Sequence, residues 1–150
     1  MFNLKNVAAV LVVPLLCSAT AWAAPDEFNI TLGVVGADPD VGKIMASLYD
    51  SAESYMEDSL VDIATDVDEH GSVRLNLGSH APGQFAIVIF YDKNENGNLD
   101  TNFIGIPKEK VGFSNNAKGR FGPAMWADAR FLLERANLQV EIELIQASKN

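Results

Sequence analysis

A run of oxygen-bearing side chains follows the apolar stretch at residues 84–91 and carries the clearest chemistry of the chain. These side chains occupy loop positions 1, 3, 5, 7 and 9, with Gly97 at position 6: Asp92, Asn94, Asn96, Asn98 and Asp100. Alternating Asp and Asn residues can direct several oxygens at one point, and Ca²⁺ takes about 6–8 oxygen ligands. Gly97 permits the positive φ that a sharp turn requires. The spacing therefore predicts a calcium site, with position 7 contributing its backbone carbonyl and position 9 binding directly or through water.

The loop departs from an EF-hand in two respects. Position 12 is Phe103, where an EF-hand has a bidentate Glu, and the flanking segments are a strand and a loop. With only two carboxylates among the predicted ligands, the dissociation constant should be on the order of 10⁻⁴–10⁻³ M, as in extracellular calcium modules. Glu109 or Asp50 could add a ligand from outside the loop. The alternative needs no metal, because Asn96-Gly97 is a strong turn dipeptide and Asx side chains cap their own backbone.

Residues 101–128 contain a second group of polar and aromatic side chains. Four basic residues lie within thirteen positions, namely Lys108, Lys110, Lys118 and Arg120. They suggest either an anion-binding patch or local charge balance with the acidic loop, and we favour charge balance. A ligand pocket is a further possibility, and its lining would be Phe103, Phe113, Asn115, Arg120 and Trp126. Packing of the aromatic residues beneath a long loop is the competing interpretation.

Catalytic patterns are weak. The two histidines, His70 and His80, stand beside turn residues, and no Gly-x-Ser-x-Gly elbow is present. The only Cys is Cys17, within the segment that we expect to be removed. The sequence therefore predicts a protein that is not an enzyme.

The first 23 residues have the form of a Sec signal peptide. Lys5 supplies the positive charge, residues 7–16 are apolar, and Ala21-Trp22-Ala23 fits a small-x-small cleavage site. Cleavage near Ala23 predicts a periplasmic or secreted protein. The remaining residues, 24–150, are predicted to form a single domain without disulfides.

Composition limits the partners of this domain. Its 127 residues hold all 20 Asp and Glu but only 10 Lys and Arg, which gives a net charge of −10. Such a surface repels nucleic acid and anionic lipid, so we expect neither as a partner. Residues 24–150 contain no apolar stretch long enough to span a membrane. The expected partner is an unknown protein or small molecule.

Alternation of apolar and polar residues predicts about seven short strands: 28–35, 43–49, 60–67, 72–77, 84–91, 129–133 and 138–145. Residues 60–67 and 72–77 suggest a hairpin with one solvated face. Residues 84–91 are apolar on both faces, which indicates a central strand covered on two sides. Short helices are expected at 51–57 and 123–128. These elements predict an all-β fold, a single antiparallel β-sandwich of the prealbumin or immunoglobulin type.

The segment 94–128 shows little periodicity yet contains many apolar residues. A structureless connection of this length is uncommon in a small domain, and its composition is too apolar for a disordered tail. We therefore expect a long ordered loop that covers one end or one face of the sandwich.

Several motifs together resemble a known family. They are Pro82-Gly83-Gln84-Phe85-Ala86-Ile87, the residues from Asp92 to Glu109, Gly112-Phe113-Ser114-Asn115-Asn116 and Phe121-Gly122-Pro123. In these motifs the chain resembles an exported bacterial family, domain of unknown function 2141, over nearly all of residues 24–150. The resemblance implies export, a β-sandwich and a distinctive loop in which Asp92, Asn94, Asn96 and Asp100 match the family pattern. The Pro-Gly-x-aromatic sequence at residues 82–85, where the strand begins, is also similar to that of prealbumin-like and carboxypeptidase-regulatory-like sandwiches. This similarity bears on the fold alone.

Two functions follow as expectations. The first is an exported, non-catalytic β-sandwich module that calcium stabilises at the Asp92 loop, with a binding or structural role. The alternative is a periplasmic small-ligand carrier or enzyme in which residues 101–128 cover a pocket.

Overall fold

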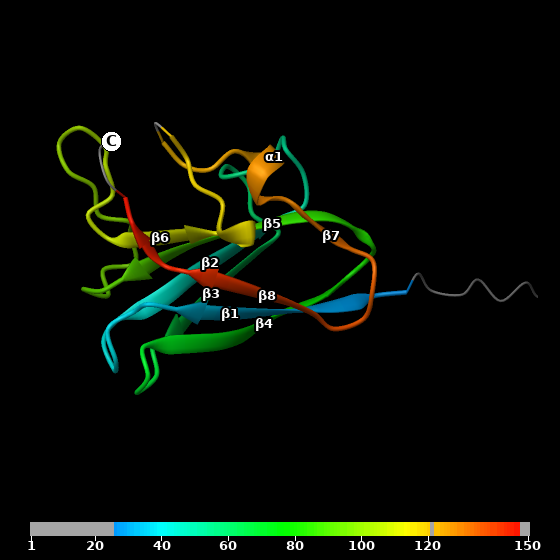
Figure 1. Cartoon of the computed structure of the whole chain (residues 1–150), viewed down its shortest axis with the longest axis horizontal. Helices are drawn as coiled ribbons and strands as arrows, with labels where there is room; N and C mark the ends of the chain where they lie inside the picture. The colour runs from blue at the N-terminus through cyan, green and yellow to red at the C-terminus, as the bar shows by residue number, and fades with distance from the viewer. Residues whose placement is uncertain (1–25, 121, 148–150) are drawn as a thin grey trace, which may run out of the picture.

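The computed structural model describes residues 26–120 and 122–147, which form two β-sheets packed face to face (Figure 1). The three-stranded sheet has the order β4-β1-β8, from Ser72–His80, Phe28–Val35 and Leu138–Glu143. The larger sheet has the order β3-β2-β5-β6-β9, from Val61–Asp66, Lys43–Tyr49, Gly83–Asp92, Lys110–Phe113 and Ile145–Gln146. A short strand, β7 (Phe131–Leu133), pairs with the start of β5. The all-β sandwich predicted from the sequence is confirmed. The expected signal peptide and its cleavage site lie outside the described residues.

The main core lies between the two sheets and is built by strand alternation. In β1, Ile30, Leu32 and Val34 are buried and face the inner side of β5, where Ile87 and Ile89 are fully buried. Removing such side chains from water contributes roughly 1.5–3 kcal/mol each to stability. This core holds the sheets together and fixes which ends of the strands meet.

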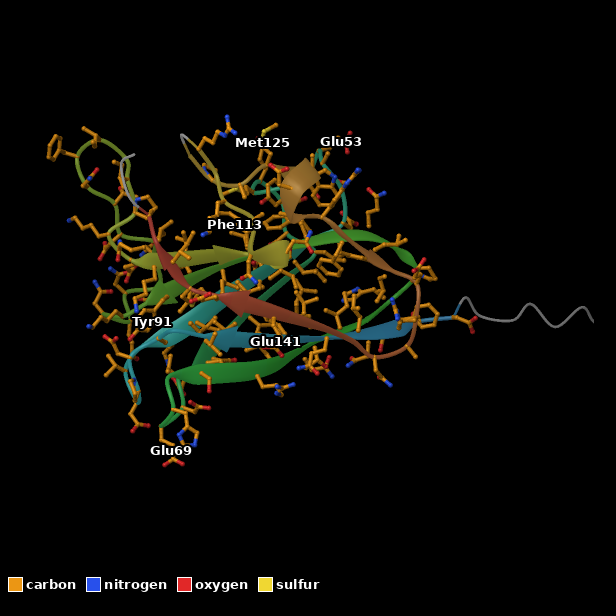
Figure 2. The ribbon with its side chains drawn as sticks, in the orientation of Figure 1. Glu53, Glu69, Tyr91, Phe113, Met125 and Glu141 are labelled. Carbon is orange, nitrogen blue, oxygen red and sulfur yellow. The ribbon has the colours of Figure 1, made fainter. Side chains whose placement is uncertain are left out.

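The outer face of β5 carries a second, smaller core. Ala86 is buried there with Val111 and Phe113 of β6, and residues Ala124 and Ala129 close over them. Figure 2 shows Phe113 beneath the segment that carries Met125. Residues 84–91 therefore have apolar partners on both faces, as the sequence predicts for a central strand.

The predicted hairpin between β3 and β4 is wrong. β3 pairs with β2, whereas β4 pairs with β1 in the other sheet, so the connection 67–71 crosses between the sheets. Both strands alternate correctly, with Val73, Leu75 and Leu77 buried in β4. Alternation determines which face of a strand is buried, and two strands of opposite sheets can share one core.

Several further details differ from the prediction. β8 runs parallel to β1, so the pairing is not antiparallel throughout. The predicted strand 138–145 ends at Glu143, and Ile145 begins β9 in the other sheet. Residues 51–57 form turns, and the predicted helix at 123–128 is the single turn α1 (Trp126–Ala129). The segment 94–128 also contains β6 and a 3₁₀ turn, η1 (Ser114–Asn116).

Candidate functional site

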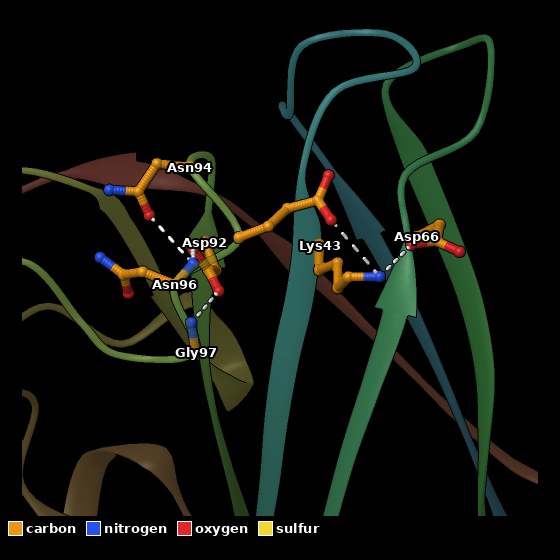
Figure 3. Close-up of polar contacts among 7 residues, drawn as sticks. Lys43, Asp66, Asp92, Asn94, Asn96 and Gly97 are labelled. Atoms are coloured by element: carbon orange, nitrogen blue, oxygen red, sulfur yellow. Dashed lines mark hydrogen bonds and ion pairs between the residues drawn. The ribbon is translucent and has the colours of Figure 1, made fainter.

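The predicted calcium loop begins at the last residue of β5. Asp92 is 1% exposed, and its side chain points back under the loop (Figure 3). Its Oδ1 accepts a hydrogen bond from the backbone N–H of Asn96 at 3.1 Å, and its Oδ2 accepts one from Gly97 at 2.7 Å. Gly97 has φ +76°, the left-handed conformation that the sequence predicts for this position. The buried carboxylate thus fixes the sharp turn.

The side chains of Asn94 and Asn96 converge on Asp100. The Asn94 Nδ2 and Asn96 Nδ2 groups lie 2.8 and 3.3 Å from Asp100 Oδ2. Their own carbonyl oxygens accept backbone N–H bonds, Asn94 Oδ1 from Asn96 and Asn96 Oδ1 from Asn98. Three predicted ligands therefore meet at one point, while the Asn98 side chain donates to the Asn96 carbonyl.

Glu109 lies beside this loop, and Asp50 lies far from it. Glu109 is 9% exposed, and its two carboxylate oxygens accept hydrogen bonds from the backbone N–H groups of Lys93 and Asp100, each at 3.0 Å. Asp50 follows the opposite end of β2, because Lys43 pairs with Asp92 and Tyr49 pairs with Ala86. The sequence suggested Glu109 as an added ligand but did not reveal that it binds both ends of the loop.

Two lysines add charge to the edge of the loop. Lys43 Nζ lies 2.7 Å from Asp66 Oδ1 and 3.6 Å from Glu95 Oε2 (Figure 3), and the bond to Asp66 raises the pKa of Lys43. Lys93 pairs with Asp38, and its ammonium lowers the pKa of that carboxyl. Both pairs are exposed, so each contributes little to stability. They partly neutralise the carboxylates around the loop.

The hydrogen bonds of the loop match the metal-free alternative in part. The Asp92 side chain caps the backbone of its own loop. Within residues 26–120 and 122–147, no group of three or more His, Cys, Asp or Glu side chains could hold a metal ion. A cation bound here would depend on amide and backbone oxygens together with the carboxylates. Rotating the Asn94 and Asn96 amides by a half turn would bring oxygens to the point that their NH₂ groups now occupy. The same rotation would break the hydrogen bonds that these two oxygens accept from the backbone N–H groups of Asn96 and Asn98.

The five residues of the predicted pocket do not surround one cavity. Phe103 is 98% exposed on the connection between β5 and β6, and Arg120 is also exposed. Phe113 is buried in the second core, where the Trp126 ring meets Tyr55 edge-on at 5.7 Å between centroids. Asn115 Nδ2 lies within hydrogen-bond distance of the carbonyls of Asp128, Ala129 and Arg130. Asn115 thus holds the covering segment in place.

Phe113 does line a small hollow of about 210 Å³. The other lining residues are Gly112, Asn116, Ala117, Lys118, Glu143 and Ile145. Sites for small molecules and cofactors usually measure roughly 300–1,000 Å³. The hollow is thus small for a carrier, and Phe113 is the one predicted pocket residue on its wall.

A buried serine is the polar residue that sequence reasoning missed. Ser114 is fully buried, its Oγ accepts from the Ile87 N–H at 2.9 Å, and it donates to the Ala129 carbonyl at 2.6 Å. It therefore joins β5 to the segment that covers the second core.

The two histidines take surface roles: His70 lies 3.5 Å from Glu69, and His80 Nε2 lies 2.9 Å from the Leu77 carbonyl.

Comparison with known proteins gives one match. A model of the family described as "Uncharacterized protein conserved in bacteria (DUF2141)" matches residues 33–141. No curated protein and no solved structure matches. Among the described residues, none of the helices has the length and apolar character needed to cross a membrane.

Proposed function

The chain belongs to the bacterial DUF2141 family, and we propose that it is an exported, non-catalytic β-sandwich module whose Asp92 loop binds Ca²⁺. The metal would stabilise the loop and the segment that follows it, and the role of the module would be binding or structural. The observation that carries this proposal is the convergence of Asn94 and Asn96 on Asp100, beside the buried Asp92.

The local chemistry supports a hard cation. Asp92 and Asp100 carry negative charge, and the amide oxygens of Asn94 and Asn96 can reach the same point after rotation. Glu109 fixes both ends of the loop, so the ordering cost of binding is partly met before a cation arrives. Because only two of the predicted ligands are carboxylates, the expected dissociation constant is on the order of 10⁻⁴–10⁻³ M.

Thermal unfolding in calcium and in chelator tests the proposal. A ligand that binds only the folded state stabilises it by about 2.7 kcal/mol at one hundred times its dissociation constant, which corresponds to a rise of several degrees in midpoint. Magnesium should give a smaller rise because it demands stricter geometry. An identical midpoint in calcium and in chelator would exclude the site.

A pair of variants makes the measurement specific. Asp100→Ala removes the carboxylate on which the two amides converge, and it should abolish the calcium-dependent rise. Asp58→Ala removes an exposed carboxylate at the opposite end of the sandwich and should leave the rise unchanged. An equal loss in both variants would indicate nonspecific counterion binding.

Export is part of the same proposal. Its support is the charged, apolar and small-x-small pattern of residues 1–23. Amino-terminal sequencing of protein recovered from the periplasm or medium should begin at Ala24. Recovery of the uncleaved chain in the cytoplasm would contradict it.

A further inference from the structure

The connection between β5 and β6 contains a well-ordered hairpin, residues 100–108. Thr101 pairs with Pro107, the Lys108 N–H donates to the Asp100 carbonyl at 2.8 Å, and the Asn102 N–H donates to the Ile106 carbonyl at 2.9 Å. The Asn102 side chain also accepts hydrogen bonds from the N–H groups of Ile104 and Ile106, both at 3.0 Å. These bonds fix the shape of the tip.

The fixed tip presents apolar side chains to solvent. Phe103 is 98% exposed and Ile104 is 53% exposed, while Leu99, just before the hairpin, is 37% exposed. Residues 101–107 carry no charge. Fully burying a Phe or Ile side chain contributes roughly 1.5–3 kcal/mol of free energy, and this fold does not gain that contribution from the exposed tip. A rigid, uncharged projection that ends in an aromatic ring has the properties of an interface anchor, because little entropy is lost when it docks.

The hairpin stands at a strongly acidic end of the sandwich. The strand ends and connections that meet there carry nine carboxylates: Asp38, Asp40, Asp66, Asp68, Glu69, Asp92, Glu95, Asp100 and Glu109. They carry four lysines: Lys43, Lys93, Lys108 and Lys110. Figure 1 shows the connection between β5 and β6 extending beyond the strands at this end. The apolar tip therefore projects from a surface of negative potential.

We propose that the tip formed by Phe103 and Ile104 docks into a protein partner that offers an apolar pocket with a rim of Lys and Arg. An apolar pocket would accept the two side chains, and a basic rim would complement the surrounding carboxylates. A bilayer fits less well, because the acidic end is repelled by anionic lipid and two side chains provide less burial than a single acyl chain, which itself anchors only marginally. This inference does not depend on calcium binding.

Selection from a phage-displayed library of folded domains with varied surfaces, with the purified protein as target, tests the proposal. Enriched domains should combine an apolar pocket with Lys or Arg around it, and their affinity should fall as salt rises. Phe103→Ser should weaken their binding at least tenfold without lowering the melting temperature, because the side chain is already in water. Leu132→Ser, at a 53% exposed position on β7, should leave binding unchanged.

Three results would overturn the proposal. The first is a selection that enriches no domain, or only domains that bind Phe103→Ser as tightly as the native protein. The second is binding to phosphatidylcholine vesicles that Phe103→Ser abolishes, which would make the tip a lipid anchor. The third is concentration-dependent self-association, measured by sedimentation, that Phe103→Ser abolishes, which would make the partner a second copy of this chain.

Discussion

Glu109 Oε1 accepts a hydrogen bond from the backbone N–H of Lys93 at 3.0 Å, between residues sixteen positions apart. Its other oxygen accepts from Asp100, so one nearly buried side chain holds both ends of the Asp92 loop. The loop is therefore ordered by a contact that involves neither turn propensity nor a metal.

Glu109→Gln should destabilise the protein by about 1–3 kcal/mol, because a Gln amide has one acceptor oxygen and leaves one of the two N–H groups unsatisfied. Urea unfolding measures the loss, and hydrogen exchange at Lys93 and Asp100 should identify the exposed amide. Glu95→Gln, at an exposed position on the same loop, should change stability by less than about 0.5 kcal/mol. Equal effects in the two variants would show that Glu109 acts through its charge alone.

Ser114→Ala should cost about 1–3 kcal/mol, because it leaves the buried N–H of Ile87 without an acceptor. It also removes the shorter of the two hydrogen bonds that the Ala129 carbonyl accepts, the other coming from Asn115. Chemical denaturation measures the difference. Ser59→Ala is the control, because its hydroxyl bonds the Asp62 carboxylate at the surface and should contribute little. A neutral Ser114→Ala would mean that water replaces the hydroxyl in both bonds.

Tyr55 should make stability fall in alkali. Burial raises the pKa of its hydroxyl to about 12, whereas an unfolded Tyr ionises near 10. The folded state holds the neutral form, so this contribution is complete below about pH 10 and is lost as pH rises toward 12. Tyr55→Phe loses one hydrogen bond to the Ala124 carbonyl, about 1 kcal/mol near neutral pH.

The stabilities of the native protein and of Tyr55→Phe should therefore converge as pH approaches 12. Thermal melts followed by circular dichroism at a series of pH values measure the difference between them. A difference between native protein and Tyr55→Phe that stays constant from pH 9 to about 12 would contradict the assignment.

Asp68 should make stability fall in acid. Backbone N–H groups of Ser72 and His70 donate to its carboxylate and lower its pKa. Its contribution is present above the unfolded pKa, near 3.9, and is lost as pH falls through the lower folded value. Asp68→Asn keeps an acceptor oxygen but cannot ionise. The stability difference between native protein and this variant should shrink as pH falls below about 4, and a difference that grows would contradict the prediction.

The sequence predicts strands well where one face is apolar. β1 and β2 match their predicted limits because every second residue is apolar along one face, from Phe28 to Val34 and from Ile44 to Leu48. β6 was missed because it has four residues and Gly112 interrupts its pattern. That glycine is required by packing, since a Cβ atom there would lie 2.6 Å from Ile142 Cγ2. No local signal reports such a contact.

Pairing and site geometry were harder to predict than strand positions. The β3–β4 hairpin failed because alternation specifies a buried face and does not identify the neighbouring strand. Spacing singles out the Asp92 loop, in which the Asn94 and Asn96 amide NH₂ groups donate to Asp100. Calcium binding by these residues stays a prediction. Ser114 and the double contact of Glu109 could not be found, because both depend on residues brought together from nine to twenty-seven positions away.

The parallel pairing of β1 with β8 has a consequence for synthesis and folding. The first described strand is flanked on one side by residues 72–80 and on the other by residues 138–143, so its sheet is completed only after residues 138–143 have been made. Contacts so distant in sequence slow folding. Until then, one edge of β1 has no partner strand, and an unpaired edge is open to pairing with another chain.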